Sequence, residues 1–313
     1  MADNVTIAES DDGQRLDRWL KKHYPAVPFG VMQKILRTGQ VRVDGKRVKG
    51  DVRLAAGQVV RIPPQLMHAP TKEREGISAR DAAFVQSLVI YQDAHVIAIN
   101  KPAGLATQGG TKINRHVDGL LDGLTVDGVR PHLVHRLDKD TSGVLLLARN
   151  PKVAKKLGEM FKGRDIRKYY WAITVPTPHL PQGKIKSRLA KVDTGRGEKM
   201  QGTVDGDGKM ALTYYQVLET AHNKLALVAF WPRTGRTHQI RVHALEMGCP
   251  LLGDYKYAPH QPILDEQPEL PKMLHLHARR LILPHPVTGK RLDVVAPLDQ
   301  GMKKTWKFFD FNP

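Results

Sequence analysis

The chain has 313 residues, of which 41% are apolar, and its 49 lysines and arginines stand against 31 acidic residues, a formal net charge of +18. This length suggests roughly two domains, and the apolar content excludes disorder of the whole chain. The longest uninterrupted apolar run, residues 225–231, is far shorter than the roughly 18 residues of a membrane helix, which excludes a spanning protein.

The N-terminal segment and the cysteine content bear on the compartment. The chain starts with MADNVTIAESDD, which is polar and acidic, whereas a secretory signal is basic and then apolar. Cys249 is the only cysteine, so an internal disulfide and a cysteine-based zinc cluster are excluded. We therefore expect a cytoplasmic protein. Its positive charge favours a nucleic-acid partner over an anionic membrane surface or mere solubility.

The first strongly basic stretch, residues 13–61, holds twelve lysines or arginines and three aspartates. RLDRWLKKHY (15–24) and FGVMQKILRTG (29–39) each space their apolar residues on one face, which predicts two short helices. VRVDGKRV (41–48) alternates around an Asp-Gly pair and predicts a hairpin. We therefore expect one small basic module.

This helix–helix–hairpin module resembles the S4 RNA-binding domain. The alternative is that its charges form a solvated face. The resemblance implies that its basic side chains contact RNA, namely Arg15, Arg18, Lys34, Arg37, Arg42, Lys46 and Arg47.

The rest of the chain is richer in strands. Polar residues after Pro63-Pro64 predict a linker over 63–83, and the second domain is expected to begin at residue 84. Strands are predicted at HVIAIN (95–100), SGVLLLARN (142–150), KLALVAFWP (224–232) and RLILPHP (280–286), and a basic helix at PKVAKKLGEMFKG (151–163). Residues 177–208 suggest a hairpin with long turns or an insertion. The larger domain is therefore α+β, with strands predominating.

The densest polar segment is HRLDKDTSG (135–143), directly before a strand that its continuous apolar run predicts to be buried. Asp138 at such a turn would be rigid yet exposed, as a catalytic carboxylate must be. A turn capped by its own side chains is an equally good interpretation. A calcium loop is rejected because Arg149 stands where the bidentate Glu is required.

Two further clusters could carry chemistry. RTGRTHQIRVH (233–243) has three arginines that could bind phosphate or pair with a carboxylate, or could form a solvated loop. KYYWA (168–172) places aromatic residues beside a basic helix, where they could stack on a flipped base or belong to the core. Histidines occur in near pairs, but without acids or cysteines at ligand spacing we expect no metal.

Together these clusters resemble the RluA-type family of pseudouridine synthases, and with the S4-like module they resemble its RluC/RluD branch. The resemblance runs from about residue 100 to 297 through NKPAGLATQGG, HRLDKDTSGVLLLARN, KYYWAI, RTGRTHQIRVHALEMGCPLLGD and LHLHARRLILPHPVTG. It implies a mixed, mostly antiparallel sheet with a cleft across its middle, and no metal or organic cofactor. The domains expected are an S4-like domain at 13–62, the linker at 63–83 and a catalytic domain at 84–313.

The resemblance also implies roles for individual residues. Asp138 would be the nucleophile, and Arg236 its cationic partner, with Arg241 as a rival. Tyr170 would stack on the uracil, with Tyr169 as a competitor one residue away. Arg136, more than His135, would contact phosphate or fill the space left by a flipped nucleotide.

The expected activity is isomerisation of uridine to pseudouridine in RNA, with large-subunit (23S) ribosomal RNA implied by the branch. A synthase acting on tRNA, and a ribosome-assembly protein that binds RNA on this fold without catalysis, are the alternatives. We expect RNA as partner, Arg136 and Arg241 among its contacts, no membrane, no metal and a monomer. His275 and His277 are expected to be buried core residues.

Overall fold

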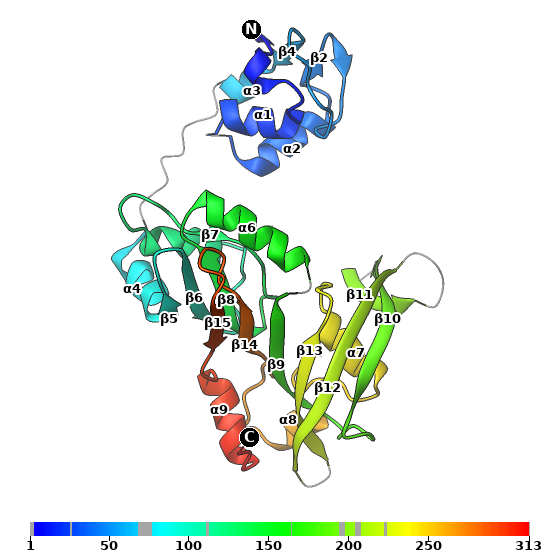
Figure 1. Ribbon diagram of the computed structural model, residues 1–313. Helices are drawn as coiled ribbons and strands as arrows, with labels where there is room; N and C mark the ends of the chain where they lie inside the picture. Colours follow the sequence, from blue (N-terminus) through cyan, green and yellow to red (C-terminus); the bar gives the residue numbers. More distant parts are fainter. Residues whose placement is uncertain are drawn as a thin grey trace. The chain divides into compact units, whose positions relative to one another are not determined.

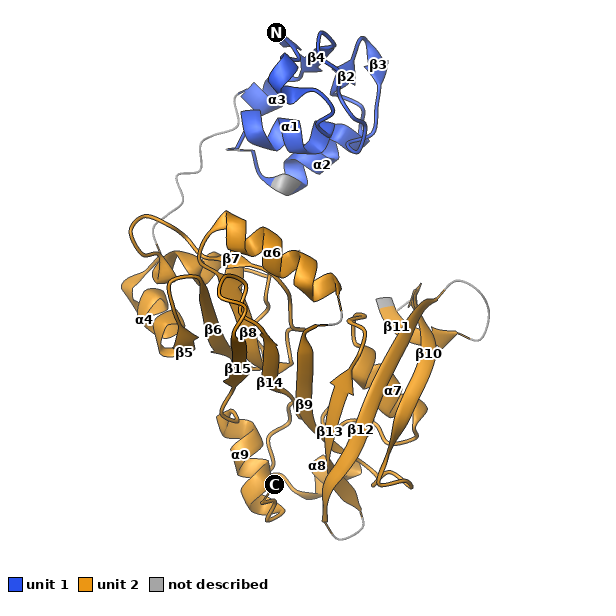
Figure 2. Cartoon of the chain, viewed as in Figure 1, with its two compact units in different colours: residues 1–76 blue, residues 77–313 orange. Residues whose placement is uncertain are grey.

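The computed structural model describes residues 3–25, 27–67, 77–110, 113–163, 165–193, 198–203, 208–221 and 224–312 (Figure 1). The chain divides into two compact units, residues 1–76 and 77–313 (Figure 2). Within the described ranges, no helix is long and apolar enough to cross a membrane. The domain limits 13–62, 63–83 and 84–313 stay a prediction, and residues 68–76 of the predicted linker lie outside the described residues.

Unit 1 contains the predicted helices and hairpin. They are α1 (Leu16–His23), α2 (Phe29–Arg37), β2 (Arg42–Val43) and β3 (Lys46–Arg47), and the hairpin turns at Asp44 and Gly45 with positive φ at both residues. Two strands that were not predicted, β1 (Asp3–Thr6) and β4 (Val59–Ile62), pair with each other and extend the hairpin to a sheet in the order β1-β4-β2-β3. The unit also contains α3 (Pro64–Met67) and a 3-10 turn, Glu9–Asp11.

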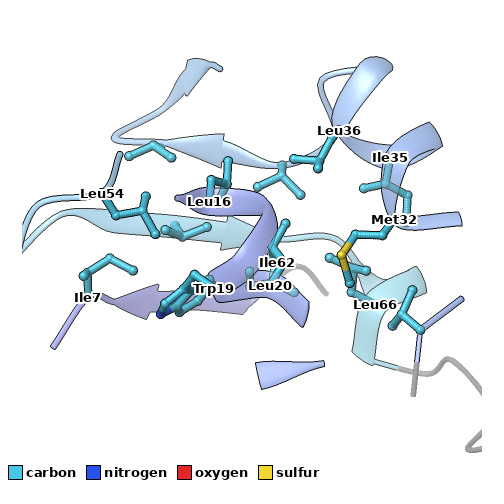
Figure 3. Close-up of a cluster of buried hydrophobic side chains, with 14 residues drawn as sticks. Ile7, Leu16, Trp19, Leu20, Met32, Ile35, Leu36, Leu54, Ile62 and Leu66 are labelled. Atoms are coloured by element: carbon cyan, nitrogen blue, oxygen red, sulfur yellow. The ribbon is translucent and has the colours of Figure 1, made fainter. Parts of the chain in front are cut away.

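A single apolar cluster holds unit 1 together (Figure 3). Leu16, Trp19 and Leu20 of α1 are at most 1% exposed, as their i, i+3, i+4 spacing predicts. They pack with Met32 of α2 and Ile62 of β4, among others. Because the apolar sides of both helices face this core, their basic residues remain at the surface.

Unit 2 is built on an eleven-stranded sheet in the order β11-β10-β12-β13-β9-β14-β8-β6-β5, with β15 beside β14 and β7 beside β8. Its strands are β5 (Val89–Gln92), β6 (Val96–Lys101), β7 (His132–Leu133), β8 (Ser142–Ala148), β9 (Arg167–Thr174), β10 (Gln182–Asp193), β11 (Glu198–Thr203), β12 (Lys209–Ala221), β13 (Leu225–Pro232), β14 (Leu276–Pro284) and β15 (Arg291–Val295). Among the strand pairs of the described residues, only β8 and β14 run parallel, so the prediction of a mixed, mostly antiparallel sheet is confirmed. The hairpin expected within 177–208 is β10–β11, whose connection, 194–197, lies outside the described residues.

Helices lie against this sheet. The predicted basic helix is α6 (Pro151–Lys162), which begins where the Asn150 side chain accepts the Val153 N–H. A helix that was not predicted, α7 (Gln239–Glu246), occupies part of the arginine cluster. The others are α4 (Ala79–Ser87), α5 (Val117–Leu120), the 3-10 turn Leu121–Leu124, α8 (Pro262–Glu266) and α9 (Gln300–Phe308).

The centre of the sheet positions the site. All seven residues of β8 are buried, as its continuous apolar run predicts. Strand β9 lies between β13 and β14, so Tyr170, paired in register with Phe230, is in the middle of the sheet. The polar segment 135–141 therefore ends at a rigid central strand.

Candidate active site

A hollow of about 290 Å³ in unit 2 brings together all three polar clusters singled out in the sequence. Asp138, Tyr170 and Arg236 all line it, although they are distant from one another in the chain. Its remaining lining is His135, Arg136, Leu137, Thr141, Phe161, Lys168, Pro232, Thr234, Gly235, Thr237, Gln239 and Ile240. The basic helix α6 borders it through Phe161.

The loop that carries Asp138 is held on both sides of that residue. Thr107 Oγ1 donates to the Leu137 carbonyl (2.7 Å) and accepts the Leu137 N–H (3.1 Å). Lys101 Nζ donates to the Lys139 carbonyl (3.0 Å). Because both neighbours of Asp138 are fixed, its carboxylate is held in place while 22% of its side chain remains exposed.

Lys101 is an ionisable residue whose role the sequence analysis did not recognise. It is fully buried, and its Nζ also donates to the carbonyls of Pro102 (2.9 Å) and Leu105 (2.7 Å). Burial lowers the pKa of Lys101 to about 8, while the charges of Asp140, Asp138 and Asp299 oppose this shift. Three carbonyl acceptors use all three ammonium protons. The NKPAG segment therefore supports the loop of Asp138 through Lys101. The signal in the sequence was a lysine at the end of an apolar strand, where its side chain could be buried.

The nearest ionisable partner of Asp138 is His238, whose Nε2 lies 3.8 Å from Asp138 Oδ2. Neither predicted arginine pairs with Asp138 within the described part of the chain. Arg236 is exposed and donates from Nε to the Met210 carbonyl (3.2 Å), although it lines the same hollow.

Arg241 does not occupy the predicted position. Its guanidinium makes two hydrogen bonds to the Asp254 carboxylate, of 2.8 and 2.6 Å, and the residue is only 5% exposed. Arg241 is therefore not among the residues that line the hollow, whereas Arg236 is. The contact of Arg241 with RNA stays a prediction.

His238 is itself held by Tyr257, which the sequence analysis did not single out. The Tyr257 hydroxyl lies 2.7 Å from His238 Nδ1 and accepts the Met200 N–H from β11 (3.1 Å). Burial raises the pKa of Tyr257, so its hydroxyl keeps the proton that it can donate to Nδ1. Burial likewise lowers the pKa of His238. This pattern favours a neutral ring with its one proton on Nε2, facing Asp138.

The structure separates the two competing tyrosines. Side chains alternate along β9, and Tyr170 lines the hollow, whereas Tyr169 approaches the ring of Trp231 (6.2 Å between centroids) outside it. Burial, and then the charge of Asp138, raise the pKa of the Tyr170 hydroxyl, so it keeps its proton at neutral pH and can donate a hydrogen bond. Tyr170 is therefore the tyrosine at the hollow.

His135 and Arg136 occupy different environments. His135 Nε2 accepts the Leu146 N–H (2.8 Å), and its ring stacks on Phe161 at 4.3 Å between centroids. Burial, and then the charge of Lys168, lower the pKa of His135 to about 3, so the ring is neutral. Arg136 is exposed at the hollow and is the better placed of the two to meet a phosphate.

Histidines 275 and 277 are core residues, as expected. Both are 0% exposed; His275 Nε2 lies 2.8 Å from Thr305 Oγ1, and His277 Nδ1 lies 2.8 Å from Ser142 Oγ. Within the described residues, no group of three histidine, cysteine or acidic side chains could hold a metal.

In unit 1 the predicted RNA-binding residues are at the surface, except Arg15, which is half-buried and pairs with Asp17 (2.6 Å). Arg42 and Arg47 donate to backbone carbonyls of Gly45 and Arg37. A hollow between α2 and the segment after the hairpin is lined by Lys34, Arg37, Arg47 and Lys49. The unit thus presents a concentrated cationic surface.

Comparison with known proteins gave matches in both units. Residues 95–246 match the family model described as RNA pseudouridylate synthase, and residues 14–60 match the S4 domain. The ribosomal large subunit pseudouridine synthase C of Rickettsia typhi is 39% identical over 91% of this chain and 93% of its own length. The protein of the same name from Escherichia coli is 35% identical over 96% and 94%.

Solved structures agree with these matches. The structure of human RNA pseudouridylate synthase domain containing 4 superposes with a TM-score of 0.62 and 30% identity, over 74% of this chain and 97% of that one.

Proposed function

The chain belongs to the RNA pseudouridylate synthase family, and on that premise we propose that it converts uridine to pseudouridine in large-subunit ribosomal RNA, with Asp138 as the catalytic carboxylate. The observation that carries the residue assignment is that Asp138, Tyr170 and Arg236, from three separate motifs, line one hollow. The choice of large-subunit RNA rests on the names of the two bacterial relatives.

The reaction explains why a carboxylate is needed. The bond between N1 of uracil and C1′ of the ribose breaks, the base turns, and C5 bonds to C1′; C5 then loses its proton and N1 gains one. While the base is detached, the ribose is electron-deficient, and the Asp138 carboxylate either adds to it covalently or stabilises its charge. The product is an isomer, so no co-reactant is consumed.

The neighbours of Asp138 divide the remaining tasks. Tyr170 stacks on the uracil and, with its proton retained, can donate a hydrogen bond as the base turns. When RNA fills the hollow, Arg236 binds a phosphate or turns toward Asp138. Its side chain is free to turn because it is exposed and not held in a buried ion pair. His238 orients Asp138 through the N–H on Nε2.

The target nucleotide must leave its stack to reach Asp138. Arg136, exposed at the hollow, is placed to contact the phosphate of the extruded nucleotide or to fill the vacated space. Unit 1 then supplies affinity, through Arg18, Lys34, Arg37, Lys46 and the other cations of its surface, rather than chemistry.

The test compares two aspartates of one loop. Purified full-length protein should form pseudouridine in transcribed large-subunit RNA without an added cofactor. Asp138→Asn should lower turnover at least about 1,000-fold while RNA affinity is kept. Asp140→Asn, the matched control two residues away, should retain turnover within about threefold.

Three results would contradict parts of this proposal. Turnover by Asp138→Asn near the wild-type rate would exclude its catalytic role. Modification of tRNA but not of large-subunit RNA would change the substrate. RNA binding by the wild type without any pseudouridine would favour a non-catalytic assembly protein.

A further inference from the structure

Three aromatic side chains form a row outside the active-site hollow. Tyr169 of β9, Trp231 of β13 and Tyr214 of β12 follow one another across three adjacent strands. The ring centroids of Trp231 lie 6.2 Å from Tyr169 and 6.3 Å from Tyr214, and the planes of Trp231 and Tyr214 differ by only 15°. The Trp231 and Tyr214 rings thus lie side by side with nearly parallel planes, whereas the Tyr169 ring is tilted by 43° to that of Trp231, and all three residues are half-buried.

The aromatic row lies on the same face of the sheet as α9, beyond the part that this helix covers. Trp171 follows Tyr169 by two residues and therefore lies on the same face of β9. Trp171 is covered by Trp306 of α9, with 6.2 Å between ring centroids. Trp231 and Tyr169, by contrast, line a hollow of about 210 Å³.

The hollow exists because β9 and β13 stop pairing. Their register ends at Tyr170 and Phe230, and the next residues of β13 are Trp231 and Pro232. Since proline has no N–H to donate, the ladder cannot continue past it in the ordinary way. The two strands therefore leave a notch at one end of the sheet.

The notch lies next to the active-site hollow. Lys168 and Pro232 line both hollows. Arg167 and Arg233 line the notch and are exposed, and neither pairs with a carboxylate in the described part of the chain. Among the residues that the structure describes, no acidic side chain lines the notch. Aromatic surfaces between free cations are what single-stranded nucleic acid binds.

We propose that Tyr169, Trp231 and Tyr214 form a second nucleotide subsite, on which an unpaired base beside the target uridine stacks while Arg167 and Arg233 bind its phosphate. The inference rests on the proposed function, because it takes the RNA strand to pass from the active-site hollow into the notch. Extrusion of the target removes a stacking partner from the neighbouring base, and the aromatic row replaces that partner.

The test measures affinity for a single-stranded fragment of large-subunit RNA that the wild type binds, and for the same RNA with one base at a time removed along its length. For the wild type, removal of one particular neighbouring base should weaken binding about tenfold. Trp231→Leu should bind the intact RNA about tenfold more weakly than the wild type does. Removal of that same base should then cause no further loss of affinity. Trp231→Phe, which keeps an aromatic face, should retain most of the effect.

Controls make each outcome decisive. Phe308→Leu changes an exposed aromatic residue of α9 and should leave both affinities unchanged. Tyr169→Leu tests the same surface from another strand should Trp231→Leu fold poorly. The subsite is overturned if the wild type binds equally well whichever base is removed. It is also overturned if the leucine variants still lose about tenfold in affinity when the critical base is removed. Absence of pseudouridine with the wild type would instead contradict the proposed function, because the binding comparison does not require turnover.

Discussion

At the scale of residues, the ionisable group that pairs with Asp138 in the described part of the chain is a histidine and not an arginine. Met200 N–H, the Tyr257 hydroxyl, the His238 ring and the Asp138 carboxylate follow one another, with distances of 3.1, 2.7 and 3.8 Å. The last distance is longer than a hydrogen bond, and such contacts often shorten when substrate binds. His238 is also the left-handed residue before α7, with φ of 52°. The left-handed backbone at His238 therefore sets the position from which its side chain extends toward Asp138.

We predict that His238→Asn slows turnover about 10- to 100-fold with little change in RNA affinity, because the shorter side chain no longer orients Asp138. Asparagine tolerates positive φ and favours the position before a helix, so the fold should be kept. Tyr257→Phe should slow turnover less, about 2- to 10-fold, because it removes one hydrogen bond behind the ring. Single-turnover rates and affinities of both variants check this, and an unchanged rate in His238→Asn would contradict it.

The same arrangement has a pH signature. Asp138, Asp254, Arg241, Lys256 and Tyr257 surround His238, and burial makes the largest contribution in lowering its pKa. The ring is therefore mostly neutral at pH 6.5, the usual pKa of histidine, and gains its second proton at a lower pH than an ordinary histidine does. We expect the inflection that His238 causes in the pH profile of turnover to lie below pH 6.5, with turnover lost on its acid side.

At the scale of elements, the site depends on a close approach of β8 and β14. Gly143 has φ of +110°, and a Cβ there would lie 2.3 Å from the Ala278 carbonyl oxygen and 2.6 Å from its nitrogen. Backbone atoms cannot move aside as a flexible side chain can. Gly143 is five residues after Asp138, so this approach determines where the loop of Asp138 enters the sheet.

Gly143→Ala should therefore lower the free energy of unfolding by about 4 kcal/mol, through backbone strain together with overpacking. Gly158→Ala, in α6 with open space around it, should instead stabilise the protein by up to about 1 kcal/mol. Denaturant unfolding followed by tryptophan fluorescence would show the two shifts. Equal denaturation midpoints for the wild type and Gly143→Ala would contradict this prediction, because they would show that β8 and β14 can move apart without loss of stability.

The elements that could be predicted are those with a regular apolar pattern. Helices α1, α2 and α6 bury one face, and β8 buries both, with Val144 and Leu146 in one core cluster and Leu145 and Leu147 in another. Helix α7 has no such pattern, because Gln239, Arg241 and His243 are all buried and each is satisfied by a partner. Sequence patterns assume that polar residues face water, so they miss this helix.

The same reasoning separates the predictable from the unpredictable parts of the site. Asp138, Tyr170 and Arg236 belong to short motifs, and all three line the hollow. His238, Tyr257 and Lys101 act through tertiary hydrogen bonds to residues distant in the sequence. The pairing of Arg241 with Asp254 likewise depends on the fold. Spacing along the chain cannot reveal such contacts.

At the scale of the whole molecule, the net charge of +18 divides between the two units. Residues 13–61 carry twelve bases and three acids, and residues 149–168 carry eight bases and two acids and border the active-site hollow. Phosphate contacts position RNA without selecting a uridine. In the proposed function, the charge therefore supplies affinity, and the loop of Asp138 supplies the chemistry.

The role of unit 1 predicts a salt dependence. Lys34→Gln with Arg37→Gln, which neutralises two cations of the hollow in unit 1, should reduce the slope of log affinity against log salt by about one for each lost phosphate contact. The rate at saturating RNA should stay unchanged. Lys303→Gln with Lys304→Gln, on α9 of unit 2, is the matched control. A slope equal to that of the wild type would contradict a contact between these two side chains of unit 1 and RNA phosphates.

The central claim is that this chain makes pseudouridine in large-subunit ribosomal RNA through Asp138. A pseudouridine map of all cellular RNA, from cells with the gene, without it, and with the gene encoding Asp138→Asn, tests it most directly. Specific pseudouridines in large-subunit RNA should disappear without the gene, return with the wild type and stay absent with Asp138→Asn. Maps that do not differ, or full restoration by the asparagine variant, would contradict it.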